Sequence, residues 1–144
     1  MKSMVKTVLF ACNMNAVRSP MAAALLRAQA GPDLRVDSAG VYEGGLDPFV
    51  EIVLAEIGVS LAGHEPKSMR GLDVEAFDLA IALTPEAAAE ARRALPREKI
   101  EYWPIDNPSE ARGGREEILA AYREVRDELR RRLAERFPQF HQKP

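Results

Sequence analysis

Along this chain, short apolar runs alternate with longer stretches in which apolar residues recur at helical spacing. Four of the short runs are typical of strands, and the first is apolar enough to be buried on both faces of a sheet. They lie at Lys6–Ala11, Leu34–Gly40, Phe77–Leu83 and Ile100–Trp103. The stretches between them repeat apolar residues every three or four positions, which predicts amphipathic helices.

Capping residues and helix breakers indicate where the predicted helices begin and end. Ser19-Pro20 should open the first helix, with Ser19 as N-cap and Pro20 at the first helical position, and Gly31-Pro32 should stop it. The other predicted helices run from Asp47-Pro48 to Gly58, from Thr84-Pro85 to Leu95-Pro96 and from about Arg115 to Phe137.

This alternation of strands and helices predicts an α/β fold, a parallel sheet with helices on both faces. In such sheets, ligands bind beyond the carboxyl ends of the strands, where the strand order reverses. The chain has 144 residues, of which 47% are hydrophobic, enough for one domain with its own core. No repeat or linker divides it, so we expect a single domain over residues 1–144.

Charge and cysteine content narrow the range of partners. A formal net charge of −2 gives no reason to expect nucleic acid or an anionic membrane as a partner. The single cysteine excludes an internal disulfide, so a reducing cytoplasm is the expected location. The apolar run after the basic residues Lys2 and Lys6 is too short for an export signal, and no stretch is long enough to span a bilayer.

The most informative segment follows the first predicted strand. It is Cys12-Asn13-Met14-Asn15-Ala16-Val17-Arg18-Ser19, which we call the Cys12 loop. A tight loop between a strand and a helix N-terminus turns backbone N–H groups toward one point, and the helix dipole adds positive charge there. The sequence therefore predicts an anion site formed by the loop itself, from Asn13 to Ser19.

Arg18 and Ser19 are residue types that can support catalysis at this anion site. The planar guanidinium of Arg18 can donate to two oxygens of a tetrahedral anion. The same positive field favours the thiolate form of Cys12, and the Ser19 hydroxyl can donate to that thiolate. This set of residues is suited to attack on phosphorus with a covalent cysteinyl-phosphate intermediate. The alternative is that Cys12 is only a buried structural thiol.

The residues named so far resemble the low-molecular-weight protein tyrosine phosphatase family, which includes related arsenate reductases. The resemblance is carried by Val8–Cys12, by Asn15, by Arg18–Ala22 and, later in the chain, by Asp37–Gly40, His64 with Lys67, Phe77-Asp78 and Trp103…Pro108. It covers nearly the whole chain. It implies a flavodoxin-like, four-stranded parallel sheet in the order 2-1-3-4.

The resemblance also implies roles. Cys12 would be the nucleophile, Arg18 the clamp on the phosphate and the transition state, and Ser19 the stabiliser of the thiolate. Asn15 would hold the loop in shape through Ser38, since asparagine tolerates the left-handed conformation that such a loop needs. His64 would support the loop from behind. His64 and His141 are too few for a metal site, and the reaction requires no cofactor.

Three positions depart from the family pattern. Met14 stands where glycine is usual, and Val17 stands where a second cysteine is common. The general acid of the family is an aspartate immediately before a proline, and this chain has Asn107 there. An amide cannot protonate a departing oxygen. Asp106 takes that role if the loop is shifted by one residue; alternatively, it caps a turn.

Three functions follow from these residues. The first is a phosphomonoesterase of the tyrosine phosphatase type, acting on phosphotyrosine or another phosphate ester. The second is an arsenate reductase, which would need an external small thiol because the chain has one cysteine. The third is a binding module for phosphate or phosphoproteins with little turnover. In each case phosphate, arsenate and vanadate are the expected oxyanion ligands.

Overall fold

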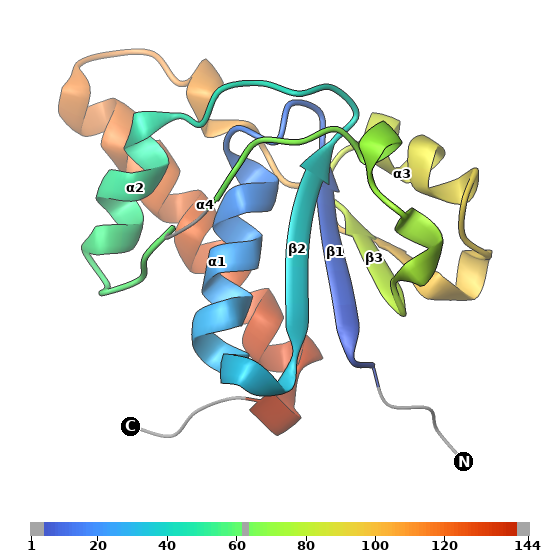
Figure 1. The fold of residues 1–144 in the computed structure, drawn as a ribbon. Coiled ribbons are helices and arrows are strands. Elements are labelled where there is room, and N and C mark those ends of the chain that lie inside the picture. The colour runs from blue at the N-terminus through green and yellow to red at the C-terminus, as the bar shows by residue number, and fades with distance from the viewer. Residues whose placement is uncertain (1–4, 62–63, 141–144) are drawn as a thin grey trace.

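The computed structural model describes residues 5–61 and 64–140, and its elements follow the predicted order (Figure 1). The strands are β1 (Thr7–Cys12), β2 (Arg35–Gly40), β3 (Leu79–Ala82) and β4 (Ile100–Tyr102). The α-helices are α1 (Arg18–Ala30), α2 (Pro48–Ala55), α3 (Pro85–Arg92) and α4 (Arg115–Arg136). All four predicted strands are confirmed, with small shifts at their ends.

The strands form one parallel sheet in the order β2-β1-β3-β4, as predicted. The chain leaves β1, places β2 on one side of it and then returns to place β3 on the other. The carboxyl end of β1 is therefore the point where the strand order reverses, and Cys12, the last residue of β1, lies opposite Gly40 there. Ligand sites of parallel sheets occur at such points.

Helices cover both faces of the sheet (Figure 1): α1, α2 and α4 pack on one face and α3 on the other. The residues of β1 point alternately into these two layers. Val8 and Phe10 join the core under α1 and α4, whereas Leu9 and Ala11 join the core under α3. Because both faces of β1 are buried, its sequence is a continuous apolar run instead of an alternating one.

The predicted helix caps are confirmed in two helices and wrong in one. Asp47 accepts a hydrogen bond from the N–H of Phe49, and Thr84 accepts one from the N–H of Ala87. The first helix begins at Arg18, with Val17 at the N-cap position, so the prediction of Ser19 as N-cap is wrong. The Ser19 hydroxyl is engaged by the site described below.

Two further helix predictions need correction at their carboxyl ends. The second helix ends at Ala55 and continues as a turn to Gly58, whose φ is +74°. The third helix ends at Arg92, before the predicted stop at Leu95-Pro96. Within residues 5–61 and 64–140, no helix combines the length and apolar character needed to cross a membrane.

Candidate active site

A small pocket lies at the carboxyl end of β1, where the sequence predicts an anion site. It measures about 80 Å³ and is lined by Cys12, Met14, Ala16, Val17, Arg18, Asn107 and Ser109. A water molecule occupies about 30 Å³ in the liquid, so only a group of a few atoms fits. The pocket joins the Cys12 loop to the loop after β4, two segments that are far apart in the sequence.

Cys12 lies at this pocket as a nearly buried thiol, with 2% of its surface exposed. Its Sγ is 2.9 Å from the Oγ of Ser19, which is fully buried. The Oγ of Ser19 also lies 3.4 Å from the carbonyl oxygen of Ala39 and accepts a hydrogen bond from the Nδ2 of Asn15 at 2.9 Å. The nucleophile candidate is therefore the end of a chain of buried hydrogen bonds.

Asn15 holds the centre of that chain in a left-handed conformation. Its φ is +55°, the single positive φ among the non-glycine residues that the structure describes. Asparagine adopts this conformation more readily than most residues. The Nδ2 of Asn15 also donates to Ser38 Oγ at 3.0 Å, which is the expected contact, and its Oδ1 accepts from the N–H of Lys67 at 2.9 Å.

Gly40 allows the Cys12 loop to approach β2 closely. A Cβ at this position would lie 2.4 Å from the carbonyl oxygen of Tyr42, 2.6 Å from the N of Asn15 and 2.8 Å from the carbonyl oxygen of Asn13. These three contacts are with backbone atoms, which cannot rotate away. The requirement for glycine here was visible in the sequence only as part of the Asp37–Gly40 resemblance, without its physical cause.

Arg18 lies half-buried on the pocket wall, at the first position of α1. Its Nη1 donates to the carbonyl oxygen of Ile105 at 3.0 Å, which ties the guanidinium to the loop after β4. No side chain in the described part of the chain caps α1, so its first backbone N–H groups remain available to a bound anion. Sequence reasoning did not identify Ile105 as the anchor of this arginine.

Asn107, and not Asp106, lies on the pocket wall. Its Oδ1 accepts from the N–H of Ser109 at 3.1 Å and from the Ser109 hydroxyl at 2.7 Å, so that it caps the short 3₁₀ helix Pro108–Glu110. Asp106 is exposed. The alternative that Asp106 caps the turn is therefore wrong, because Asn107 fills that place. With its oxygen engaged, Asn107 has only its NH₂ group to present to the pocket.

Asn13 is held outside the pocket wall by a residue that sequence reasoning did not assign to the site. The hydroxyl of Thr84, the N-cap of α3, donates to Asn13 Oδ1 at 2.7 Å. The carbonyl oxygen of Asn13 accepts from the N–H of Tyr42 at 2.7 Å. These bonds fix the first half of the Cys12 loop between β3 and the segment after β2.

His64 lies behind the Cys12 loop, and its pKa is lowered. Burial is the largest cause, followed by the positive charges of Lys67 and Arg27; a hydrogen bond with the backbone of Asn15 acts in the opposite direction. Its Nε2 is buried without a hydrogen-bond partner in the described structure. The hydrogen bond with Asn15 places His64 beside the Cys12 loop, and its role as a support of that loop stays a prediction.

The described residues contain no group of three or more histidine, cysteine, aspartate or glutamate side chains placed to hold a metal ion. His141 lies outside the described residues.

A wider groove of about 560 Å³ adjoins the pocket and shares Ala16, Val17 and Ser109 with it. Its far wall contains Phe49 and Tyr122, whose ring centroids are 5.3 Å apart. Burial, together with the hydrogen bond that the Tyr122 hydroxyl donates to Asp47, raises the pKa of Tyr122 well above its ordinary value. The groove is large enough for the remainder of a substrate whose anionic end fills the pocket.

The sheet order β2-β1-β3-β4, with a buried cysteine and an arginine on the wall of one small pocket at the end of β1, defines a class of single-domain α/β proteins. The model of the family "low molecular weight phosphotyrosine protein phosphatase" matches residues 7–143. The chain therefore belongs to this family.

Relatives within the family carry more than one activity in their names. An arsenate reductase of Bacillus subtilis is 32% identical to this chain over 130 residues, which cover 90% of this chain and 94% of the relative. A mutant of YwlE from Bacillus subtilis is 27% identical in sequence, with a TM-score of 0.76 over 93% of this chain and 97% of that chain. A cysteine-to-serine mutant of the YwlE arginine phosphatase, with a phosphorylated active-site serine, is 26% identical, with a TM-score of 0.75 over 92% of this chain and 94% of that chain.

Proposed function

We propose that this protein is a cysteine-dependent phosphomonoesterase of the low-molecular-weight phosphatase type, with Cys12 as its nucleophile. The observation that carries the proposal is the position of Cys12 Sγ, 2.9 Å from the Ser19 hydroxyl and on the wall of a pocket of about 80 Å³. Arg18 lines the same pocket, so the sulfur of Cys12 and a guanidinium adjoin one small space. That space suits a single tetrahedral anion.

The first half of the proposed reaction forms a cysteinyl phosphate. The Arg18 guanidinium and the free N–H groups at the start of α1 bind the phosphate oxygens. The thiolate of Cys12 then attacks phosphorus, so that an S–P bond forms as the P–O bond to the leaving group breaks. Since Asn107 has no acidic proton to give, the leaving group departs as an anion and takes its proton from water.

The second half returns the enzyme to its starting state. Water attacks the phosphorus of the cysteinyl phosphate, the S–P bond breaks, and inorganic phosphate is released together with the proton from water. The Ser19 hydroxyl donates to the departing thiolate and stabilises it. The cycle needs Cys12 reduced, which accords with a cytoplasmic location, because no second cysteine in the chain can protect it as a disulfide.

The direct test compares the hydrolysis of p-nitrophenyl phosphate by the wild type and by Cys12→Ser. We expect the variant to lose essentially all turnover, because a serine hydroxyl in this pocket is a far weaker nucleophile than a thiolate. Acid quenching of the wild-type reaction, followed by mass spectrometry, should trap phosphate on Cys12. Equal rates in the two proteins would remove Cys12 from the mechanism.

Arsenate reduction is the second candidate, supported by the arsenate reductase of Bacillus subtilis that is 32% identical to this chain. Cys12 would attack arsenate with loss of water. An external thiolate would then attack the sulfur of the adduct, so that As(V) leaves as arsenite and Cys12 forms a mixed disulfide. A second external thiol would reduce that disulfide. Arsenate-dependent oxidation of NADPH in a coupled glutathione system tests this candidate; vanadate binding without turnover in either assay would favour a binding module.

A further inference from the structure

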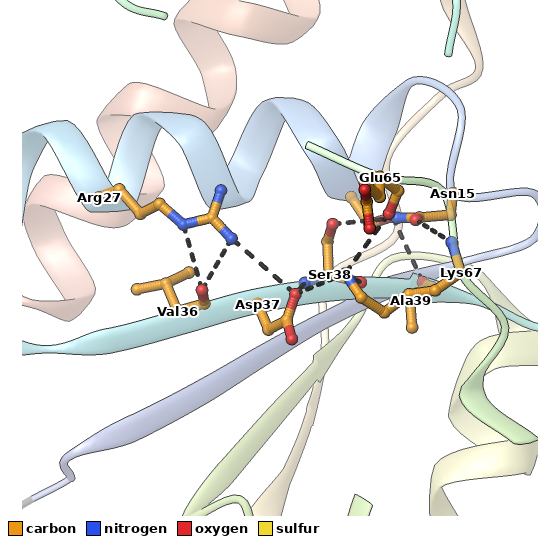
Figure 2. Close-up of polar contacts among 9 residues, drawn as sticks. Asn15, Arg27, Val36, Asp37, Ser38, Ala39, Glu65 and Lys67 are labelled. Carbon is orange, nitrogen blue, oxygen red and sulfur yellow. Dashed lines mark hydrogen bonds and ion pairs between the residues drawn. The ribbon is translucent and has the colours of Figure 1, made fainter. Parts of the chain in front are cut away.

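Lys67 makes two kinds of contact behind the Cys12 loop, one with its side chain and one with its backbone (Figure 2). Its ammonium donates to Asp37 Oδ1 at 2.9 Å and to the carbonyl oxygens of Ser38 and Glu65, each at 3.4 Å. Its backbone N–H donates to Asn15 Oδ1 at 2.9 Å. The side chain of Lys67 therefore binds β2, and its backbone N–H binds Asn15 in the Cys12 loop.

The backbone contact decides which way the Asn15 amide points. An amide oxygen accepts and an amide NH₂ donates, so the N–H of Lys67 fixes the Oδ1 of Asn15 on its own side. The Nδ2 must then point toward the hydroxyls of Ser19 and Ser38, at 2.9 Å and 3.0 Å. Rotating the amide by half a turn would place its NH₂ against the N–H of Lys67, and two donors repel.

The orientation of Asn15 in turn decides where the hydrogen of Ser19 goes. The Ser19 oxygen accepts from Asn15, which leaves its one hydrogen free to donate. Two acceptors lie within reach of that hydrogen: the carbonyl oxygen of Ala39, to which Ser19 donates at 3.4 Å, and Cys12 Sγ, which is nearer at 2.9 Å and accepts when Cys12 is a thiolate. A thiolate accepts hydrogen bonds and cannot donate, so the bond from Ser19 stabilises the reactive form of Cys12.

From these contacts we infer that Lys67 is a positioning residue for the nucleophile. Its ammonium holds the segment after His64 against Asp37, and this keeps the N–H of Lys67 on Asn15. Hydrogen bonds then run in one direction from Lys67 through Asn15 and Ser19 to Cys12. Lys67 is not among the residues that line the pocket, so the effect that we assign to it reaches Cys12 through this chain of hydrogen bonds. The catalytic importance of Lys67 rests on the proposed function, but its effect on Cys12 does not.

The experiment measures the rate at which iodoacetamide alkylates Cys12 at pH 7, a reaction of the thiolate that needs no phosphate substrate. The hydrogen bond from the Ser19 hydroxyl to the Cys12 thiolate is a bond to a charged group, and such bonds are strong. Weakening it in Lys67→Met should therefore slow alkylation about tenfold. Lys67→Arg, which keeps the charge opposite Asp37, should retain most of the wild-type rate. Ser19→Ala lacks the hydroxyl through which Lys67 acts, so adding Lys67→Met to it should change the rate less than about twofold.

Arg123→Met is the matched control, because it also breaks an ion pair of similar length and exposure. The Arg123–Glu56 pair measures 2.8 Å with both side chains 34% exposed, and the Lys67–Asp37 pair measures 2.9 Å with side chains 35% and 19% exposed. The control should alkylate at the wild-type rate. An unchanged rate in Lys67→Met, or an equal loss with and without the Ser19 hydroxyl, would overturn the inference. Failure of the proposed phosphatase activity would appear separately, as equal turnover by wild type and Cys12→Ser.

Discussion

Replacing Asn107 by aspartate should restore a proton donor to the leaving group while changing almost nothing else. The two side chains have the same shape, and Asn107 already lies on the pocket wall. One carboxyl oxygen of the aspartate would keep the bonds from the N–H and hydroxyl of Ser109, which are 3.1 Å and 2.7 Å long in the wild type. The other oxygen would take the place of the Asn107 NH₂ group.

The size of the effect should depend on the leaving group. General acid catalysis contributes about 10²- to 10⁴-fold, and only to groups that leave poorly as anions. Phenol, with a pKa of about 10 as in tyrosine, is such a group, whereas p-nitrophenol is much more acidic and leaves unaided. We therefore expect Asn107→Asp to raise kcat/KM for phenyl phosphate by about 10²-fold or more and to change that for p-nitrophenyl phosphate little. The gain should decline as the pH rises, because the aspartate must be protonated to act.

The assay is steady-state hydrolysis of both esters across pH, with Asp106→Asn as the matched control on the neighbouring residue. Asp106 is exposed, so its replacement should leave both rates unchanged. If Asn107→Asp brings no gain with phenyl phosphate while Asp106→Asn lowers the rate, Asp106 supplies the proton in solution. The assignment of the pocket wall to Asn107 would then be refuted.

Three other substitutions test separate parts of the structure. Gly40→Ala should abolish most phosphatase activity and cost about 1–3 kcal/mol of stability, because its Cβ would lie 2.4–2.8 Å from backbone atoms; Gly71→Ala, with open space around it and away from the pocket and the groove, should match the wild type in both turnover and thermal unfolding. Arg18→Lys should lower kcat/KM by about 10²-fold, since an ammonium replaces the two-pronged guanidinium, while circular dichroism should stay unchanged. Hydrogen bonds from Arg123 are the largest cause that lowers the pKa of Glu56 from 4.5 to about 2. A lowered carboxyl pKa stabilises the fold fully above pH 4.5 and no longer below about pH 2. The wild type should therefore be more stable than Glu56→Gln at neutral pH, and this difference should shrink as the pH falls from 4.5 to about 2.

The fold was accessible from the sequence because its signals are local. The continuous apolar run of β1, the caps Asp47 and Thr84, and the alternation of strands and helices each lie within a few residues. Ser19 shows where local rules stop. A serine followed by proline is a typical helix start, but its hydroxyl is bound to Cys12 and Asn15, contacts that exist only in the folded loop. Tertiary contacts therefore override the capping preference at this position.

The two loops of the candidate site differed in how far the sequence revealed them. The Cys12 loop is contiguous, so spacing alone placed Cys12, Arg18 and Ser19 together. The contacts that support it are distant: Lys67 is 52 residues from Asn15, and Ile105 is 87 residues from Arg18. Both hydrogen bonds are made by backbone groups, which every residue possesses, so the side chain at either position does not by itself reveal the bond. The sequence pointed to Lys67 only through the family resemblance, and it did not point to Ile105.

The hydrogen bonds around Cys12 and those around Asn107 differ in how readily a substitution is tolerated. Cys12, the proposed nucleophile, belongs to a buried set of hydrogen bonds with Asn15, Ser19 and Ser38, in which the loss of one partner leaves another unsatisfied. Asn107 lies in the loop after β4, where its side chain is bonded to its neighbour Ser109 and, within the described residues, to no member of the buried set. A change from aspartate to asparagine there costs the buried set nothing. If Cys12 is the nucleophile as proposed, a substitution at position 107 would therefore alter the leaving groups that the reaction accepts and leave the attacking residue in place.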